Sequence, residues 1–148
     1  MKAAIFATVV LLFSSAAQAF ELAAGPAEGG KVNWQRVSRS GIEHQEALAQ
    51  AKQSKKPILM FFTCGCDDCK AFWGKQLSDD NVARFSEGYI RLLIRGNPAL
   101  ARKYNVEDCP EIQIANSDGK VRTVLRKERL IPMSGEKLAK GLRASAKR

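Results

Sequence analysis

Three of the four cysteines in the chain lie within one short stretch, FFTCGCDDCKAF, at Cys64, Cys66 and Cys69. The fourth, Cys109, comes much later and precedes Pro110. Cysteine thiols close structural disulfides, bind soft metal ions or act as nucleophiles in thiol–disulfide exchange. Their spacing helps to separate these possibilities. The Cys66-Asp-Asp-Cys69 spacing allows two sulfur atoms to meet at one corner of the fold.

The Cys66–Cys69 pair stands between two predicted elements. A short apolar run, ILMFF, indicates a buried strand over 58–62, and CKAFWGKQL has helical spacing over 69–77. Unpaired N–H groups at a helix start carry partial positive charge, which stabilises a thiolate, the nucleophile in disulfide exchange. We therefore expect Cys66 to attack a substrate disulfide and Cys69, one turn later, to resolve the mixed disulfide.

The rest of the pattern predicts an α/β domain with a central mixed sheet of about four strands and helices on both faces. A second buried strand is expected over 89–94, and a hairpin over 109–127 that turns at Ser117-Asp118-Gly119. Further helices are expected over 40–56, where Ser40 is a candidate N-cap, and over 78–88, 97–105 and 134–148.

The N-terminus has the pattern of a secretory signal peptide. A lysine precedes an apolar run, and Ala17-Gln18-Ala19 forms a small-x-small cleavage site, so we expect cleavage after Ala19. A membrane anchor is the alternative interpretation. Residues 20–39 are expected to be a flexible lead-in, and 40–148 the folded domain. This organisation predicts a periplasmic or secreted protein, in a compartment where thiols oxidise unless they are kept reduced.

Composition restricts the function further. The chain has 148 residues, enough for one domain, and a formal net charge of +9. We interpret this charge as a solvated basic surface, with attraction to acidic partners or membrane surfaces as the alternative. Basic runs interleaved with aromatic residues are absent, so nucleic acid is not an expected partner. We expect His44, the only histidine, to lie on the surface of the first helix.

From about residue 40 to the C-terminus the chain resembles proteins of the thioredoxin fold. The segment YNVEDCPEIQI, over 104–114, is similar to the family's Y-G-I-x-x-x-P-T segment. KKPILMFF and LSDDNVARF are similar to the periplasmic C-terminal domain of DsbD-type disulfide reductases. The resemblance implies a monomeric thiol–disulfide oxidoreductase without a cofactor, acting as a reductant or redox relay. Its implied partners are protein thiols and disulfides and a membrane-embedded or periplasmic redox protein.

The resemblance also implies roles for residues near the pair. Pro110 matches the family's cis-proline, which shapes the substrate groove, so Cys109 and Gly65 are expected beside that groove. Gly65 stands where thioredoxins have tryptophan, and this flank should be less covered. Met60 stands where many members have a buried acid that assists proton transfer, so that assistance should be missing.

Asp67 and Asp68 lie between the two cysteines of the pair. Their carboxylates oppose ionisation of the neighbouring thiol, so we expect them to tune its pKa. They also suit a helix N-terminus, which gives them a purely structural alternative.

Cys64 and Cys109 leave a second function open. If Cys109 approaches Cys66 and Cys69, three thiols, with Cys64 as a possible fourth, are suited to Cu(I) or Zn, as in a metallochaperone. Alternatively Cys109 is a small buried hydrophobic residue. Cys64 is a second resolving thiol, a ligand or an ordinary strand-end residue, and we favour the last. A third possibility is a redox-inactive thioredoxin fold that only recruits partners.

Overall fold

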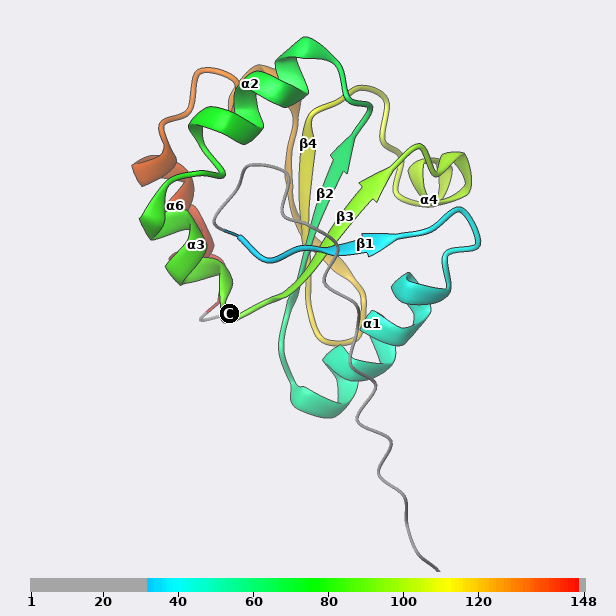
Figure 1. The fold of residues 1–148 in the computed structure, drawn as a ribbon. Helices are drawn as coiled ribbons and strands as arrows, with labels where there is room; N and C mark the ends of the chain where they lie inside the picture. The colour runs from blue at the N-terminus through cyan, green and yellow to red at the C-terminus, as the bar shows by residue number, and fades with distance from the viewer. Residues whose placement is uncertain (1–31, 147–148) are drawn as a thin grey trace, which may run out of the picture.

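The computed structural model describes residues 32–146 (Figure 1). The expected signal peptide and residues 20–31 of the expected lead-in lie outside this part. The strands are β1 (Gln35–Val37), β2 (Ile58–Thr63), β3 (Ile90–Arg95), β4 (Glu111–Ala115) and β5 (Val121–Leu125). The helices are α1 (Ile42–Ser54), α2 (Asp67–Lys75), α3 (Asp80–Ser86), α4 (Pro98–Lys103), α5 (Lys127–Leu130) and α6 (Gly135–Ser145).

The strands form one mixed sheet in the order β1-β3-β2-β4-β5. β1, β3 and β2 run parallel, whereas β4 is antiparallel to both β2 and β5. The predicted α/β class and mixed sheet are confirmed, but the sheet has five strands rather than the expected four. The extra strand is β1, which pairs with β3 at one edge.

β1 corrects the expected domain boundary at residue 40. Val32 is 3% exposed, and Trp34 packs against Phe61 and Trp73, with ring centroids 5.8 and 6.2 Å away. The described end of the expected lead-in is therefore part of the domain. Three residues are too few to show a clear strand periodicity, and the sequence offered no other signal for β1.

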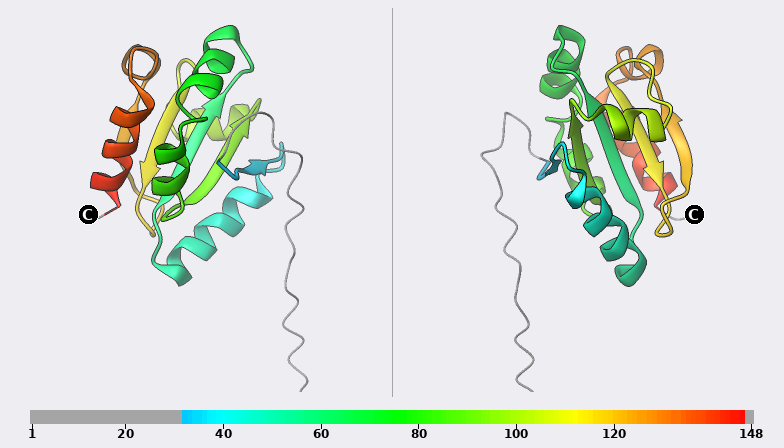
Figure 2. Two further views of the ribbon diagram at one scale, coloured as in Figure 1. Left: turned by 60° about the vertical axis from the view of Figure 1, so that its left-hand side comes forward. Right: turned by 90° about the vertical axis from the view of Figure 1, so that its right-hand side faces the viewer.

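Two helical layers cover the sheet, as the views in Figure 2 show: α1 and α4 on one face, α2, α3 and α6 on the other. β2 lies at the centre and faces both layers. Its Leu59 and Phe61 pack in the core beneath α2 and α6, and its Met60 and Phe62 pack beneath α1 and α4. A central strand buried on both faces explains the continuous apolar run ILMFF.

The topology brings three chain segments to one edge of the sheet. β2 and β3 are parallel, and their last residues, Thr63 and Arg95, are paired in register. β4 runs the other way, so its first residue, Glu111, pairs with Phe62 beside the same edge. The loop after β2, the start of α2 and the Cys109–Pro110 segment therefore meet there.

Local signals for the helix ends were partly misleading. Ser40 is not the N-cap of α1. Gly41 occupies that position with φ 72°, a left-handed conformation that glycine adopts without a Cβ penalty. The short helix α5 was not predicted, because four residues between a strand and a Pro-containing turn carry no helical period.

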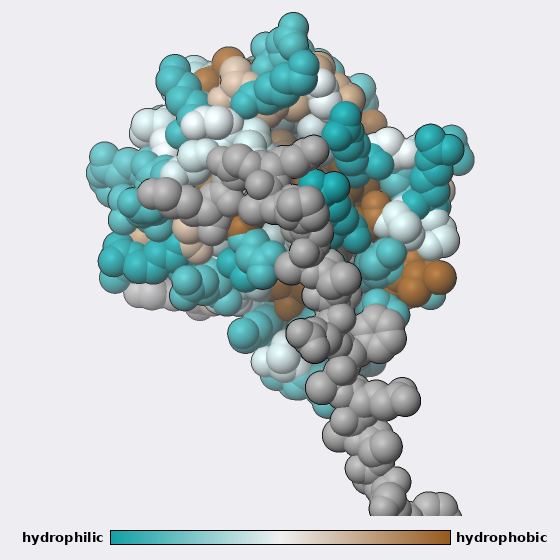
Figure 3. Space-filling model, viewed as in Figure 1, coloured by the Kyte–Doolittle hydropathy of each residue, from teal (hydrophilic) through white to brown (hydrophobic). Residues whose placement is uncertain are grey.

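Within residues 32–146 no helix is both long enough and apolar enough to cross a membrane. On the face drawn in Figure 3, polar side chains predominate among the coloured residues, and apolar patches are small and scattered.

Candidate active site: four cysteines at one edge of the sheet

The four cysteine sulfur atoms converge at this edge, and all lie within 4.8 Å of one another. Cys64 follows the end of β2, Cys66 and Cys69 lie at the start of α2, and Cys109 precedes β4. The peptide bond between Cys109 and Pro110 is cis, the isomer that the family resemblance implies. The approach of Cys109 to Cys66 and Cys69 agrees with the sequence-based expectation.

Cys66 is the N-cap residue of α2. Its sulfur accepts a hydrogen bond from the backbone N–H of Cys69, at 3.4 Å, and lies 3.0 Å from the Cys69 sulfur. Cys66 is half-buried, whereas Cys69 is only 2% exposed and packs under α2. A partner protein can therefore reach Cys66 more easily than Cys69.

The two thiols of this pair ionise unequally. Burial, the hydrogen bond to Cys69 and the negative charge of Asp68 raise the pKa of the Cys66 thiol. Burial also opposes ionisation of Cys69, but hydrogen bonds from Cys66, from the Thr63 hydroxyl and from the backbone of the preceding loop outweigh it and lower the Cys69 pKa. The negative charge of the pair is thus favoured on Cys69. This differs from the expectation that the helix start favours a thiolate on Cys66.

Cys64 and Cys109 form a disulfide that joins segments 45 residues apart in sequence. This corrects the interpretation of Cys64 as an ordinary strand-end residue, and that of Cys109 as only a small buried hydrophobic residue. Cys64 is exposed and Cys109 is half-buried. The Cys64 sulfur lies 3.7 Å from that of Cys69, so the disulfide borders the free pair.

Asp67 and Asp68 differ in their surroundings. Asp67 is fully exposed and pairs with Lys70 at 3.2 Å, so it turns away from the sulfur atoms. Asp68 lies 2.8 Å from the Nζ atom of Lys127, which also contacts Asp108 at 3.4 Å. Hydrogen bonds to these two carboxylates raise the pKa of Lys127 to about 12.

Lys127 therefore links the start of α2 to the residue before Cys109. Sequence reasoning missed it, because α5 was not predicted and a lone lysine carries no signal. Sequence reasoning also missed Thr63, whose hydroxyl stabilises a Cys69 thiolate, because a single threonine at a strand end carries no signal.

Gly65 adopts φ 77°, and a Cβ atom placed there would lie 2.8 Å from a guanidinium nitrogen of Arg95. The flank that lacks the family's tryptophan is therefore covered by an arginine from the end of β3. Met60, at the position of the family's buried acid, is fully buried in the core.

Two hollows flank the cluster of cysteines. One, of about 500 Å³, is lined by Cys69 and by Gly65, Trp73 and Arg95 among others, and we call it the α2 hollow. The other, of about 360 Å³, is lined by Cys64 and Cys109 together with residues of α4, and we call it the α4 hollow. Cys69 and the Cys64–Cys109 disulfide thus border different hollows.

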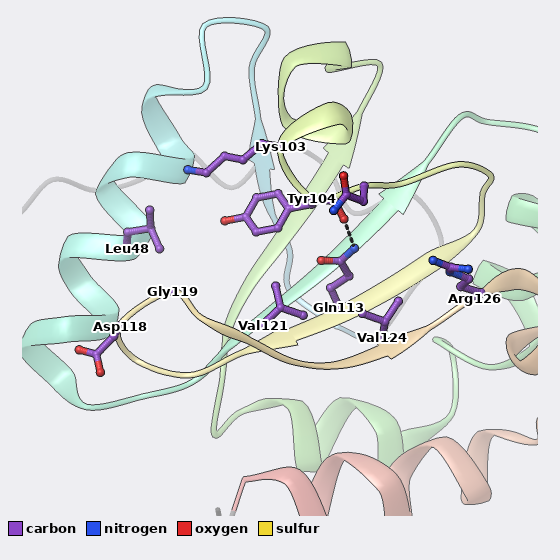
Figure 4. Close-up of a pocket in the computed structure, with 10 residues that line it drawn as sticks. Leu48, Lys103, Tyr104, Gln113, Asp118, Gly119, Val121, Val124 and Arg126 are labelled. Carbon is purple, nitrogen blue, oxygen red and sulfur yellow. Dashed lines mark hydrogen bonds between the residues drawn. The ribbon is translucent and has the colours of Figure 1, made fainter.

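A third hollow, of about 520 Å³, lies between α1 and the β4–β5 hairpin, and none of the cysteines lines it (Figure 4). His44 packs near it. The ring is 2% exposed, its Nε2 lies 2.6 Å from the Tyr104 hydroxyl, and burial with the nearby charge of Lys103 lowers its pKa. The expected surface position of His44 is wrong, because the face of α1 that carries it packs against the sheet.

No protein-family model and no curated protein matches the chain. Solved structures do match. The structure titled "DsbH Oxidoreductase" is 20% identical over 83% of this chain and 90% of its own, with a TM-score of 0.63. A disulphide isomerase from Xylella fastidiosa Temecula1 is 25% identical over 79% and 98%, with a TM-score of 0.62.

The reduced DsbD C-terminal domain of Neisseria meningitidis is 15% identical over 74% of this chain and 98% of its own, with a TM-score of 0.60. The resemblance drawn from the sequence is therefore confirmed at the level of the fold. Together with the sheet order and the position of the cysteines, these matches show that the chain has the thioredoxin-like fold.

Proposed function

We propose that the protein is a thiol–disulfide oxidoreductase that acts through Cys66 and Cys69. One observation carries this proposal: the two free thiols lie 3.0 Å apart at the start of α2, one accessible and one buried. Two sulfur atoms so close are poised to interconvert between dithiol and disulfide with little movement of the backbone. The known structures with this fold, two of which are named as an oxidoreductase and a disulphide isomerase, support the same chemistry.

Cys66 is the proposed nucleophile because it is the more accessible of the two. Its proton passes to Cys69 across the short contact, and the Cys66 thiolate attacks a sulfur of the partner's disulfide. A Cys66–partner bond forms, the partner's S–S bond breaks, and its other sulfur leaves as a thiolate. Cys69 passes its proton to the partner's thiolate and then attacks Cys66. The Cys66–Cys69 disulfide forms, the Cys66–partner bond breaks, and the released sulfur takes a proton from water, so that the partner leaves as a dithiol.

The Cys109–Pro110 segment is the proposed docking site for the partner's extended chain. The Cys66 sulfur lies 3.8 Å from the Cys109 carbonyl oxygen, so this segment borders the attacking atom. A backbone carbonyl at that position is able to pair with an N–H group of a bound peptide, which would hold the partner's disulfide over Cys66. Gly65, which lines the α2 hollow together with Cys69, is the proposed second border of this docking site.

We further propose that the protein works after export, in the periplasm or outside the cell. The signal-peptide pattern that ends at Ala19 supports this location. In an oxidising compartment a reductant needs a supply of electrons, so the proposed partner for recycling is a membrane-embedded or periplasmic thiol–disulfide protein.

The test is the reduction of insulin disulfides by the mature chain, in wild-type form and with Cys66→Ser. We expect turbidity from the precipitating insulin B chain with the wild type, and only the uncatalysed rate with the variant. Circular dichroism of both proteins controls for folding. Wild-type protein that does not accelerate insulin reduction would contradict the proposal and favour a fold that only recruits partners.

A soft-metal site is the second candidate function, and the convergence of all four sulfur atoms within 4.8 Å favours it. Four thiolates around Zn, each about 2.3 Å from the metal, lie about 3.8 Å from one another. The cluster comes close to that arrangement once the Cys64–Cys109 disulfide is reduced. Cu(I) is also suited to thiolate ligands.

Metal analysis of protein purified under reducing conditions tests this candidate. Stoichiometric Zn or Cu that is lost in Cys109→Thr, with the circular dichroism spectrum unchanged, would support a metallochaperone. Metal-free protein that reduces insulin would leave the oxidoreductase as the function.

A further inference from the structure

The oxidised and reduced cysteine pairs lie in contact, with Cys69 between them. Its sulfur is 3.0 Å from that of Cys66 and 3.7 Å from that of Cys64, which is bonded to Cys109. The Cys69 sulfur is thus close to the Cys64 sulfur but not in line with the Cys64–Cys109 bond, since all four sulfur atoms lie within 4.8 Å. Thiol–disulfide exchange needs the attacking thiolate in line with the bond that breaks, so the exchange begins with a side-chain rotation of Cys64 or Cys69. The site therefore holds two couples rather than one.

We propose that the Cys64–Cys109 disulfide is a second redox couple, which exchanges with the Cys66–Cys69 pair inside the molecule. This inference rests on the proposed oxidoreductase function and adds to it an internal electron relay. Electrons enter at one pair and leave at the other, so the protein transfers them between partners that dock at different places.

The exchange proceeds in two steps. First, the Cys69 thiolate attacks the Cys64 sulfur: a Cys64–Cys69 bond forms, the Cys64–Cys109 bond breaks, and Cys109 leaves as a thiolate that takes up a proton. Second, Cys66 gives up its proton to solvent and its thiolate attacks Cys69: the Cys66–Cys69 bond forms, the Cys64–Cys69 bond breaks, and Cys64 leaves as a thiolate that takes up a proton. Two electrons pass from the first pair to the second, and no external oxidant or reductant is consumed.

The burial of the cysteines agrees with this order of steps. Cys69 is 2% exposed, so its thiolate reaches no bulky partner but does face the Cys64 sulfur. Hydrogen bonds from Thr63 and the neighbouring backbone favour the negative charge on that same sulfur. The buried member of the pair is thus placed for internal attack, and the accessible Cys66 for attack on a partner.

The surface around the disulfide allows a second partner to reach it. Cys64 is exposed, and both Cys64 and Cys109 line the α4 hollow. Cys69 lines the α2 hollow instead, on the other side of the cluster. A purely structural disulfide has no need of an accessible sulfur beside a hollow, whereas a couple that exchanges with a partner does.

Peptide mapping distinguishes the two disulfides. Trypsin leaves Cys64, Cys66 and Cys69 on one peptide that ends at Lys70, and places Cys109 on the peptide Tyr104–Lys120. A Cys64–Cys109 bond joins the two peptides, whereas a Cys66–Cys69 bond leaves Cys109 free for alkylation. The fraction of alkylated Cys109 in one-disulfide protein therefore reports the position of the bond.

The experiment prepares one-disulfide protein by two routes: fully reduced protein with one equivalent of diamide, and fully oxidised protein with one equivalent of dithiothreitol. After removal of the reagent, samples are incubated without oxygen, quenched with acid, alkylated and mapped. The relay predicts that both routes reach the same ratio of the two disulfides, and that tenfold dilution leaves the ratio and the rate unchanged.

The controls are Cys66→Ser, which should accumulate the Cys64–Cys69 intermediate with Cys109 alkylated, and Cys66→Ser/Cys69→Ser, which lacks any attacking thiol and should keep Cys109 protected. The relay is overturned if the two routes keep different ratios of the two disulfides or if exchange slows on dilution. It is also overturned if only one of the two disulfides is found in the one-disulfide form of the wild-type protein. Insulin reduction by the wild type is measured separately. Activity without exchange would remove the relay alone, whereas exchange without activity would remove the proposed function.

Discussion

The two cysteine pairs share one site and one chemistry but differ in the chain that separates their members. Cys66 and Cys69 lie within the first turn of α2, and a disulfide between them closes a loop of only a few residues. Cys64 and Cys109 are 45 residues apart, and their disulfide joins the end of β2 to the start of β4. The first pair can change its redox state with little effect on the rest of the fold, whereas the second also restrains the unfolded chain.

The largest expected effect is on stability, because replacement of the two cysteine pairs should lower the free energy of unfolding by different amounts. Cys64→Ser/Cys109→Ser should lower the free energy of unfolding by about 2–4 kcal/mol under oxidising conditions, because the long loop is no longer closed in the unfolded state. Cys66→Ser/Cys69→Ser is the matched control and should lose far less. Urea denaturation with and without dithiothreitol measures both, and the difference should vanish when dithiothreitol is present. Equal losses in the two double variants would remove the distinction.

A smaller effect concerns the loop between the pairs. Gly65→Ala should destabilise the protein by about 1–2 kcal/mol, because an alanine at positive φ is strained and its Cβ meets the Arg95 guanidinium. Gly74→Ala in α2 is the control, since no atom lies within 4 Å of its Cβ and its φ is not positive. That change should be neutral or stabilising. Thermal melts that show the same sign for both variants would argue against this account of Gly65.

A change confined to the first pair is expected from the carboxylate near Cys66. Asp68→Asn should lower the pKa of Cys66, because it removes a negative charge that opposes the thiolate and frees the Lys127 cation. Lys127→Gln should raise that pKa, since Asp68 then lacks its counter-charge. Asp67→Asn should have little effect, because Asp67 pairs with Lys70 in solvent. The pH dependence of iodoacetamide labelling at Cys66 measures all three, and a larger shift for Asp67 than for Asp68 would reverse their roles.

The smallest effect lies on the strand behind Cys109. Burial raises the pKa of Glu111, despite the hydrogen bond from Gln113 and the charge of Arg126. A carboxyl group whose pKa is raised by folding favours the folded state when protonated, and this contribution is lost as the pH rises through its folded pKa. Glu111→Gln should therefore gain stability at neutral pH relative to the wild type, and less at acidic pH. Urea midpoints at two pH values test the sign, and a gain that grows towards acid would contradict it.

The sequence predicted most of the fold because the dominant signals were local. The apolar run of β2, the cysteine spacing and the resemblance around Pro110 were enough to place Cys66, Cys69 and Cys109 at one edge. β1 and α5 escaped because such short elements depend on tertiary pairing rather than on a periodic pattern. The predicted surface position of His44 was wrong because the sequence of α1 alone does not show which face of the helix packs against the sheet.

The arrangement within the site was harder to predict. Which two of four nearby cysteines are bonded depends on the loop after β2, and so does the direction in which Cys64 points. The distribution of charge within the Cys66–Cys69 pair depends on the Thr63 hydroxyl and on Asp68, whose orientation follows from Lys127 in an unpredicted helix. These contacts are made between segments that are distant in sequence, so no local pattern encodes them.

The central claim, that Cys66 is the atom that meets the substrate and Cys69 the atom that releases it, has a direct test. Each single variant, Cys66→Ser and Cys69→Ser, is prepared in its one-disulfide form, mixed with insulin and quenched with acid, and mass spectrometry identifies the cysteine that carries any adduct. The account predicts a stable insulin adduct on Cys66 in Cys69→Ser, and no adduct on Cys69 in Cys66→Ser. An adduct on Cys69 in Cys66→Ser, with none in Cys69→Ser, would contradict the account and reverse the two roles.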